Sequence, residues 1–96
     1  MDDMQSEMSI DSDGDKRWVV NGKLHREDGP AVEWANGDKE WWQHGQIHRT
    51  DGPAIQWHYG AIEWCLHGYC YAFDQWLRRN YEMTDEEKVM MKLQYG

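Results

Sequence analysis

The chain has 96 residues, which fits one domain with a thin core, and its seven Trp, five Tyr and one Phe must supply much of that core. No stretch approaches the roughly 20 apolar residues that span a bilayer, and the acidic N-terminus lacks the apolar run of a signal peptide. With two cysteines in all, the composition also excludes a secreted disulfide scaffold, so we expect a cytoplasmic protein without membrane contacts.

The formal net charge of −8 is distributed unevenly along the chain. Residues 1–15 contain six acids and no base, whereas residues 16–96 contain the other 12 acids against all 10 bases. Segments with such charge and little apolar content stay solvated, so we expect residues 1–12 to form an acidic, disordered tail. The nearly balanced remainder argues against a fold that imitates DNA or binds nucleic acid directly.

A repeat of 23 residues organises the region that follows. Residues 18–40 and 41–63 align without a gap and are identical at eleven of 23 positions, with Trp, His and Pro among them. The pattern continues for part of a unit on both sides, over residues 13–16 and 64–71. We therefore expect residues 13–71 to form one repeat array, with two full units between two halves.

Each unit carries two turn signals that end in glycine. Asn-Gly and Asp-Gly pairs among them favour two-residue hairpin turns, which need positive φ at both positions. Short runs rich in Trp, Val and Ile flank the turns, as expected for strands. The sequence therefore predicts a mainly β fold, an antiparallel meander of β-hairpins in a single sheet, in which each HRxDGPA segment makes a longer bend. The expected hairpin tips are Gly14, Gly22, Gly37, Gly45, Gly60 and Gly68.

Two-residue turns also determine which side chains share a face of the sheet. One face collects apolar residues and is the expected core: Val19, Leu24, Trp42, Ile47, Cys65 and Cys70. The opposite face pairs a Trp with a His or a Tyr, and we expect it to be partly exposed. Its pairs are Trp18–His25, Trp41–His48 and Trp64–Tyr71.

Beyond Tyr71 the apolar period changes from that of a strand to that of a helix. Aromatic and aliphatic residues are spaced for one helical face over about 73–81, and a Thr-Asp-Glu-Glu capping box precedes a second helix at about 85–94. We expect residues 72–96 to form a helical cap over the open edge of the last hairpin.

The unit W-x-x-N-G-K-x-H-R-x-D-G-P-A resembles repeats in uncharacterised proteins of bacteriophages and large DNA viruses, over residues 13–71. The ending TDEEKVMMKLQYG is also similar to the close of such phage proteins. More distantly, the spacing from Trp18 to His25 resembles MORN repeats, which are β-hairpin arrays, although Arg26 and Arg49 stand where those repeats have glycine. The resemblance implies an all-β repeat sheet and a viral origin, and it identifies no catalytic residue.

An Arg-x-Asp-Gly-Pro segment recurs in the bends, with Arg26 and Asp28 in one and Arg49 and Asp51 in the other. In a structural interpretation, each Asp accepts hydrogen bonds from turn amides and each Arg packs along a neighbouring Trp. In a functional interpretation, the arginines form a row that holds phosphates or carboxylates in forked geometry. We favour the structural interpretation, because residues copied in every unit usually serve the unit.

The histidines lack the tight spacing of a zinc site, and a hydrogen bond across the hairpin is the expected role of His25 and His48. Cys65 and Cys70 should face each other across a hairpin, which allows a disulfide, but their apolar counterparts in the other units favour small core residues. Residues 11–15 have part of a calcium-loop pattern without its glycine at the sixth position or its distal Glu, so we interpret them as a turn.

No nucleophile elbow, phosphate loop or protected carboxylate pair is present, so we expect neither an enzyme nor a bound cofactor or metal. Because Trp, Tyr and Arg dominate interface energies, the sequence favours a protein that binds a host macromolecule. The predicted binding residues are Trp18, His25, Arg26, Trp41, His48, Arg49, Trp64 and Tyr71.

The favoured function is inhibition or redirection of a host complex, such as a CRISPR–Cas defence complex, in the host cytoplasm. Two alternatives remain open. One is a sponge that sequesters a nucleotide signal between Trp and Arg side chains. The other is a DNA mimic or a virion component. A host protein is the expected partner, and a homodimer through a sheet edge is a further arrangement that the pattern allows.

Overall fold

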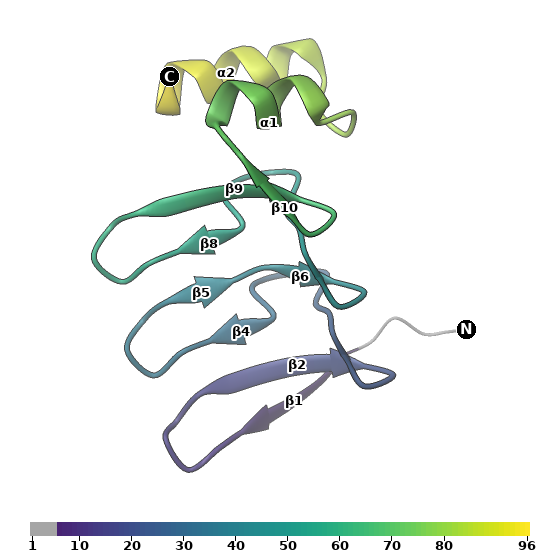
Figure 1. Ribbon diagram of the computed structural model, residues 1–96, viewed down its shortest axis with the longest axis vertical. Helices are drawn as coiled ribbons and strands as arrows, with labels where there is room; N and C mark the ends of the chain where they lie inside the picture. Colours follow the sequence, from purple (N-terminus) through teal and green to yellow (C-terminus); the bar gives the residue numbers. More distant parts are fainter. Residues whose placement is uncertain (1–5) are drawn as a thin grey trace.

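The computed structural model describes residues 6–96, which form ten β-strands followed by two helices (Figure 1). This arrangement confirms a mainly β, antiparallel meander with two C-terminal helices. The elements are β1 (Glu7–Ile10), β2 (Lys16–Val20), β3 (Lys23–Leu24), β4 (Val32–Glu33), β5 (Lys39–Glu40), β6 (Trp42–Gln43), β7 (Gln46–Ile47), β8 (Ile55–Gln56), β9 (Ile62–Leu66), β10 (Tyr69–Tyr71), α1 (Phe73–Arg79) and α2 (Asp85–Tyr95).

The strands do not form a single sheet, so that prediction is wrong. Eight strands pair in the order β1-β2-β4-β5-β8-β9-β10, with β3 attached to β2, while β6 and β7 form a separate hairpin. The break lies at Trp41, whose N–H is donated to the carbonyl of Ala54 while its own carbonyl accepts from His48. The backbone therefore changes partners at this residue. At the equivalent Trp18 the strand stays continuous, because β1 pairs alongside it.

The tips at Gly22, Gly45 and Gly68 are two-residue turns, as predicted. The residue before each glycine also has positive φ, 52° in all three turns, which is the requirement of a type I′ turn. These turns give the expected partners, including Trp42 with Ile47 and Cys65 with Cys70.

The tips at Gly14, Gly37 and Gly60 are longer than predicted. In the second of them, Gly37 N–H is donated to the carbonyl of Trp34, and Trp34 N–H is donated to the carbonyl of Asp38. Only the glycine has positive φ, 101° at Gly37. This is the three-residue hairpin loop in which a type I turn ends in a left-handed glycine. A Gly signal alone does not distinguish the two loop lengths.

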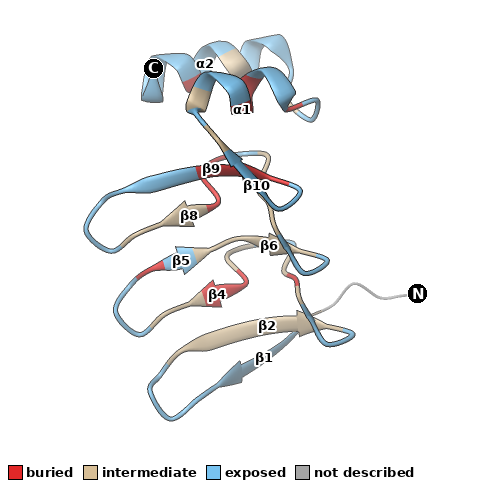
Figure 2. Cartoon of the chain, in the orientation of Figure 1, coloured by how far each residue is buried: buried red, intermediate tan, exposed pale blue. Residues whose placement is uncertain are grey.

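The predicted core face is not the core. Of its six residues only Cys65 is buried, and Cys70 is exposed. The main core instead lies where the helices meet β9, on the opposite face of the last hairpin (Figure 2). Side chains of α1 and α2 pack against Trp64 and Leu66, whereas five of the six residues on the predicted face stay partly or fully exposed. The core cluster is Trp64, Leu66, Trp76, Leu77 and Met91.

Cys65 and Cys70 are joined by a disulfide, so the preference for two small core thiols was wrong. The two residues are direct cross-strand partners in the β9–β10 hairpin, with Cα atoms 3.9 Å apart. The cross-strand position of the two cysteines therefore predicts their bonding better than the apolar pairs at the equivalent positions of the other units.

The helices match their predicted positions within two residues at each end. The capping box is present, since Glu87 N–H is donated to Thr84 Oγ1 over 3.2 Å and Thr84 N–H is donated to Glu87 Oε1 over 2.8 Å. Within residues 6–96, neither helix is long and apolar enough to cross a membrane. At the other end, β1 lies inside the segment assigned to the acidic tail, and residues 1–5 of that segment lie outside the described residues.

Candidate functional site

The two bends are built around arginines stacked on tryptophans. The guanidinium carbon of Arg26 lies 3.9 Å from the ring centre of Trp18, and that of Arg49 lies 4.0 Å from the ring centre of Trp41. Such cation–π contacts stabilise partly buried pairs by about 0.5–2 kcal/mol. The predicted packing of Arg along Trp is therefore present in both bends.

The same arginines bind their own bend through hydrogen bonds. Arg49 Nε donates to Asp51 Oδ1 over 2.8 Å and Arg49 Nη1 donates to the carbonyl of Pro53 over 3.0 Å. Arg26 makes the same two bonds to Asp28 and Pro30, at 3.0 and 3.1 Å. The expectation that each Asp caps turn amides is thus corrected, because the Asp carboxylates accept from arginine instead.

The glycine of the Asp-Gly-Pro segment makes room for this arginine. A Cβ added to Gly52 would lie 2.7 Å from Arg49 Cζ, and one added to Gly29 would lie 3.0 Å from Arg26 Cζ. The distance at Gly52 is shorter than Cβ contacts in proteins allow, and the distance at Gly29 is at their lower limit. Glycine suits this position of the bend because a larger residue would contact the arginine side chain.

The histidines link one hairpin to the next rather than crossing a single hairpin, which corrects the expected role. His25 Nδ1 accepts from the backbone N–H of His44, and His48 Nδ1 accepts from that of His67, each over 2.9 Å. Because Nδ1 is an acceptor, Nε2 of His25 carries the ring proton and donates to Glu27, 2.6 Å away. Burial and the neighbouring His67 lower the pKa of His48, against a smaller opposite effect of Glu82.

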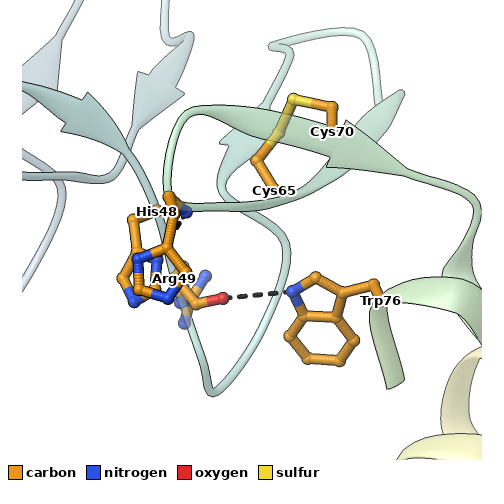
Figure 3. Close-up of a disulfide and its surroundings, with 6 residues drawn as sticks. His48, Arg49, Cys65, Cys70 and Trp76 are labelled. Atoms are coloured by element: carbon orange, nitrogen blue, oxygen red, sulfur yellow. Dashed lines mark hydrogen bonds between the residues drawn. A yellow bond between two sulfur atoms is a disulfide. The ribbon is translucent and has the colours of Figure 1, made fainter. Parts of the chain in front are cut away.

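The helices hold the second bend in place. Trp76 Nε1 donates to the carbonyl of Arg49 over 3.2 Å, a bond drawn in Figure 3 beside the Cys65–Cys70 disulfide. Asn80 is buried and its Nδ2 donates to the carbonyl of Thr50 over 2.7 Å. Two bonds from α1 and its C-cap thus fix the backbone of this bend.

A cleft of about 630 Å³ lies between the two bends. The ring of Trp41, with Arg49 stacked on it, forms one part of its wall. Two guanidinium groups and four carboxylates line it, so its net charge is negative. The lining residues are Arg26, Glu27, Asp28, Gly29, Trp41, Gln43, His48, Arg49, Thr50, Asp51 and Glu82.

Half of the predicted binding residues line the cleft: Arg26, Trp41, His48 and Arg49. The others lie elsewhere. Trp18 is half-buried beneath Arg26 and does not line the cleft, and His25 is almost completely buried, with 1% of its surface exposed. Trp64 belongs to the helix-covered core, and Tyr71 packs against it.

Sequence reasoning missed Glu82, which reaches the cleft from the segment between the helices. Glu82 belongs to no repeat unit, so no internal comparison marks it. Glu27 and Thr50, at equivalent positions of the two units, were also missed, because they differ in residue type.

The carboxylates of Asp11, Asp13 and Asp15 have oxygens within 4.8 Å of one another, but their bonds are those of a turn. Asp11 Oδ1 accepts from the backbone N–H of Asp13 and of Asp15, and Asp11 Oδ2 accepts from Arg17. The bond from Arg17 is the main cause that lowers the pKa of Asp11. Asp15 in turn accepts from Ala35 N–H, which ties the loop to the next unit.

Four of the predicted binding residues therefore line a polar cleft between the two bends, and Glu82 reaches it from the segment between the helices. Comparison with known proteins adds no assignment, since no family model, no curated protein and no solved structure matches the chain.

Proposed function

We propose that the chain is a binding module whose cleft between the two bends receives part of another protein. The observation that carries the proposal is the cleft itself, walled by Trp41 and by an arginine that is already held in place. Rigid aromatic and arginine side chains lose little entropy on binding and are typical anchors of protein interfaces. The two bonds from α1 and Asn80 to the second bend add to this preorganisation.

The charge of the cleft favours a protein partner over a nucleotide. Four carboxylates face two guanidinium groups there. Two nitrogens of Arg49 already donate to Asp51 and Pro53, so the fork that would grip a phosphate is engaged. A lysine or arginine side chain of a partner would complement Glu27 and Glu82 better than a phosphate would. The nucleotide sponge is therefore the weaker alternative.

The repeat and the resemblance extend the proposal. We propose that each 23-residue unit is one hairpin module of a MORN-like array, since positions 23 residues apart carry matching stacking and hydrogen bonds. On the resemblance to phage and large-virus proteins, we propose a viral, non-enzymatic inhibitor that acts in a host cytoplasm, with a defence complex such as CRISPR–Cas as its target. A DNA mimic gains no support from the region after residue 15, because its 12 acids are nearly balanced by 10 bases.

The experiment compares the proteins captured from a bacterial lysate by the unaltered chain and by Glu82→Lys. No hydrogen bond among the described residues uses the Glu82 side chain, so reversing its charge should spare the fold. The matched control is Glu63→Lys on β9, which is exposed and does not line the cleft. The proposal requires that a specific protein is captured by the unaltered chain and the control and lost with Glu82→Lys. Equal capture by both variants contradicts it, and release of a nucleotide on denaturing the purified protein favours the sponge.

A further inference from the structure

The last hairpin of the array differs from the two before it in one covalent feature. A disulfide joins Cys65 on β9 to Cys70 on β10, whereas apolar side chains occupy the same cross-strand positions in the other two hairpins. The equivalent pairs are Val19–Leu24 and Trp42–Ile47. All three hairpins have the same two-residue turn, with φ of 52° at the residue before glycine. The two unbridged hairpins show that a disulfide is not needed to close a hairpin of this repeat.

The two ends of the bridge differ in their access to solvent. Cys70 is exposed, whereas Cys65 is completely buried. Side chains alternate between the faces of a hairpin, so the cysteines lie on the face opposite Trp64 and Tyr71, which belong to the helical core or pack against it. A thiolate in solution therefore reaches Cys70 before it reaches Cys65.

The buried end of the bridge also holds the second bend. Arg49 N–H is donated to the carbonyl of Cys65 over 3.1 Å. The first bend is held in the same way, since Arg26 N–H is donated to the carbonyl of Trp42 over 3.2 Å. Both bends are thus tied to the hairpin that follows them, but only the second is tied to a residue whose covalent bonding can change.

We propose that the Cys65–Cys70 disulfide is a redox site, opened by a dithiol reductant, that controls how firmly the second bend is held. A thiolate of the reductant attacks the Cys70 sulfur, the sulfur–sulfur bond breaks, and Cys65 leaves and takes up a proton. The second thiol of the reductant then displaces Cys70. The protein gains two electrons and two protons, and the dithiol becomes a disulfide. Each step is reversible, so a disulfide of the same class restores the bridge.

Opening the bridge affects the bend through the carbonyl of Cys65. Without the covalent bond, Cys65 and Cys70 stay together only through the backbone pairing of the hairpin. The carbonyl is then freer to move, so the hydrogen bond from Arg49 N–H breaks more often. Since Arg49 lines the cleft, the reduced protein should bind a partner there more weakly. Only this last consequence rests on the proposed function.

Amide hydrogen exchange, followed by NMR in oxidised and in reduced protein, tests the proposal. Dithiothreitol is the reductant, and alkylation of both thiols measures the loss of the bridge. Arg49 N–H should exchange about tenfold or more faster after reduction, because its acceptor is less restrained. Arg26 N–H is the internal control and should keep its rate. The circular dichroism spectrum should not change, because the other two hairpins pair without a bridge.

The matched control is the double variant Cys65→Val with Cys70→Leu, which reproduces the apolar pair of the first hairpin. Dithiothreitol should leave the exchange of Arg49 N–H in this variant unchanged. A bridge that resists dithiothreitol until the protein unfolds overturns the proposal. Equal changes at Arg49 and Arg26, or no change at either, overturn it as well. The exchange rates are measured without a partner, so their failure is distinguishable from a failure of the proposed function.

Discussion

Replacing Arg49 by Ala should lower the free energy of unfolding by about 2–3 kcal/mol, which is the sum of the contributions of three contacts. The guanidinium is 20% exposed and lies 4.0 Å from the ring of Trp41, which gives about 1–2 kcal/mol for the stacking. Its hydrogen bond to the carbonyl of Pro53 contributes about 1 kcal/mol. The pair with Asp51, which is 82% exposed, adds at most about 0.5 kcal/mol.

Urea unfolding followed by tryptophan fluorescence measures the loss, and a thermal scan should show the midpoint falling by roughly 10–20 °C for a domain of this size. Arg26→Ala is the matched comparison, because Arg26 makes the equivalent contacts in the first bend, and its loss should be similar. Arg49→Lys keeps the charge but not the forked donors, so it should retain part of the stability. A loss below about 0.5 kcal/mol for Arg49→Ala would refute the assignment of the arginine to the bend.

Three further predictions concern His48, the bend glycines and the capping box. Because the pKa of His48 is lowered in the folded state, the stabilisation linked to its neutral ring should be complete above the unfolded pKa near 6.5 and should decline as the pH falls below that value. Thermal scans between pH 8 and pH 5 can follow this decline, and His48→Gln should lose this dependence. Gly52→Ala should destabilise by about 1–3 kcal/mol and by more than Gly29→Ala, given the shorter Cβ contact at Gly52, and equal losses in urea unfolding would contradict this. Thr84→Ala should cost about 1 kcal/mol and reduce helical circular dichroism, and an unchanged spectrum would show that the capping box is dispensable.

Local signals were sufficient to predict the hairpins and the helices. The Asn-Gly turn at Gly22 and the capping box at Thr84 depend only on neighbours in the chain, and both are present as expected. The three-residue loop at Gly37 was not predicted, because Asn-Gly suits both loop types and the choice depends on the strands that meet there.

Long-range packing was not predictable from the pattern. The alternation of side chains identified an apolar face, but which face is buried depends on where α1 and α2 dock, and no repeat unit contains that information. The hydrogen bonds from Trp76 to Arg49 and from Asn80 to Thr50 likewise join residues 27 and 30 positions apart, which no local pattern connects. The cleft was predicted only as a row of arginines, since the approach of Glu82 depends on the same docking.

Covalent capture from inside the cleft tests the central claim most directly. A photoreactive amino acid at position 82 would lie in the lining of the cleft, and one at position 63 would lie outside it on β9. On illumination in a host cell, we predict a discrete adduct with one host protein from position 82 and none from position 63. The same adduct from both positions, or none from position 82, would contradict a protein-binding site between the bends.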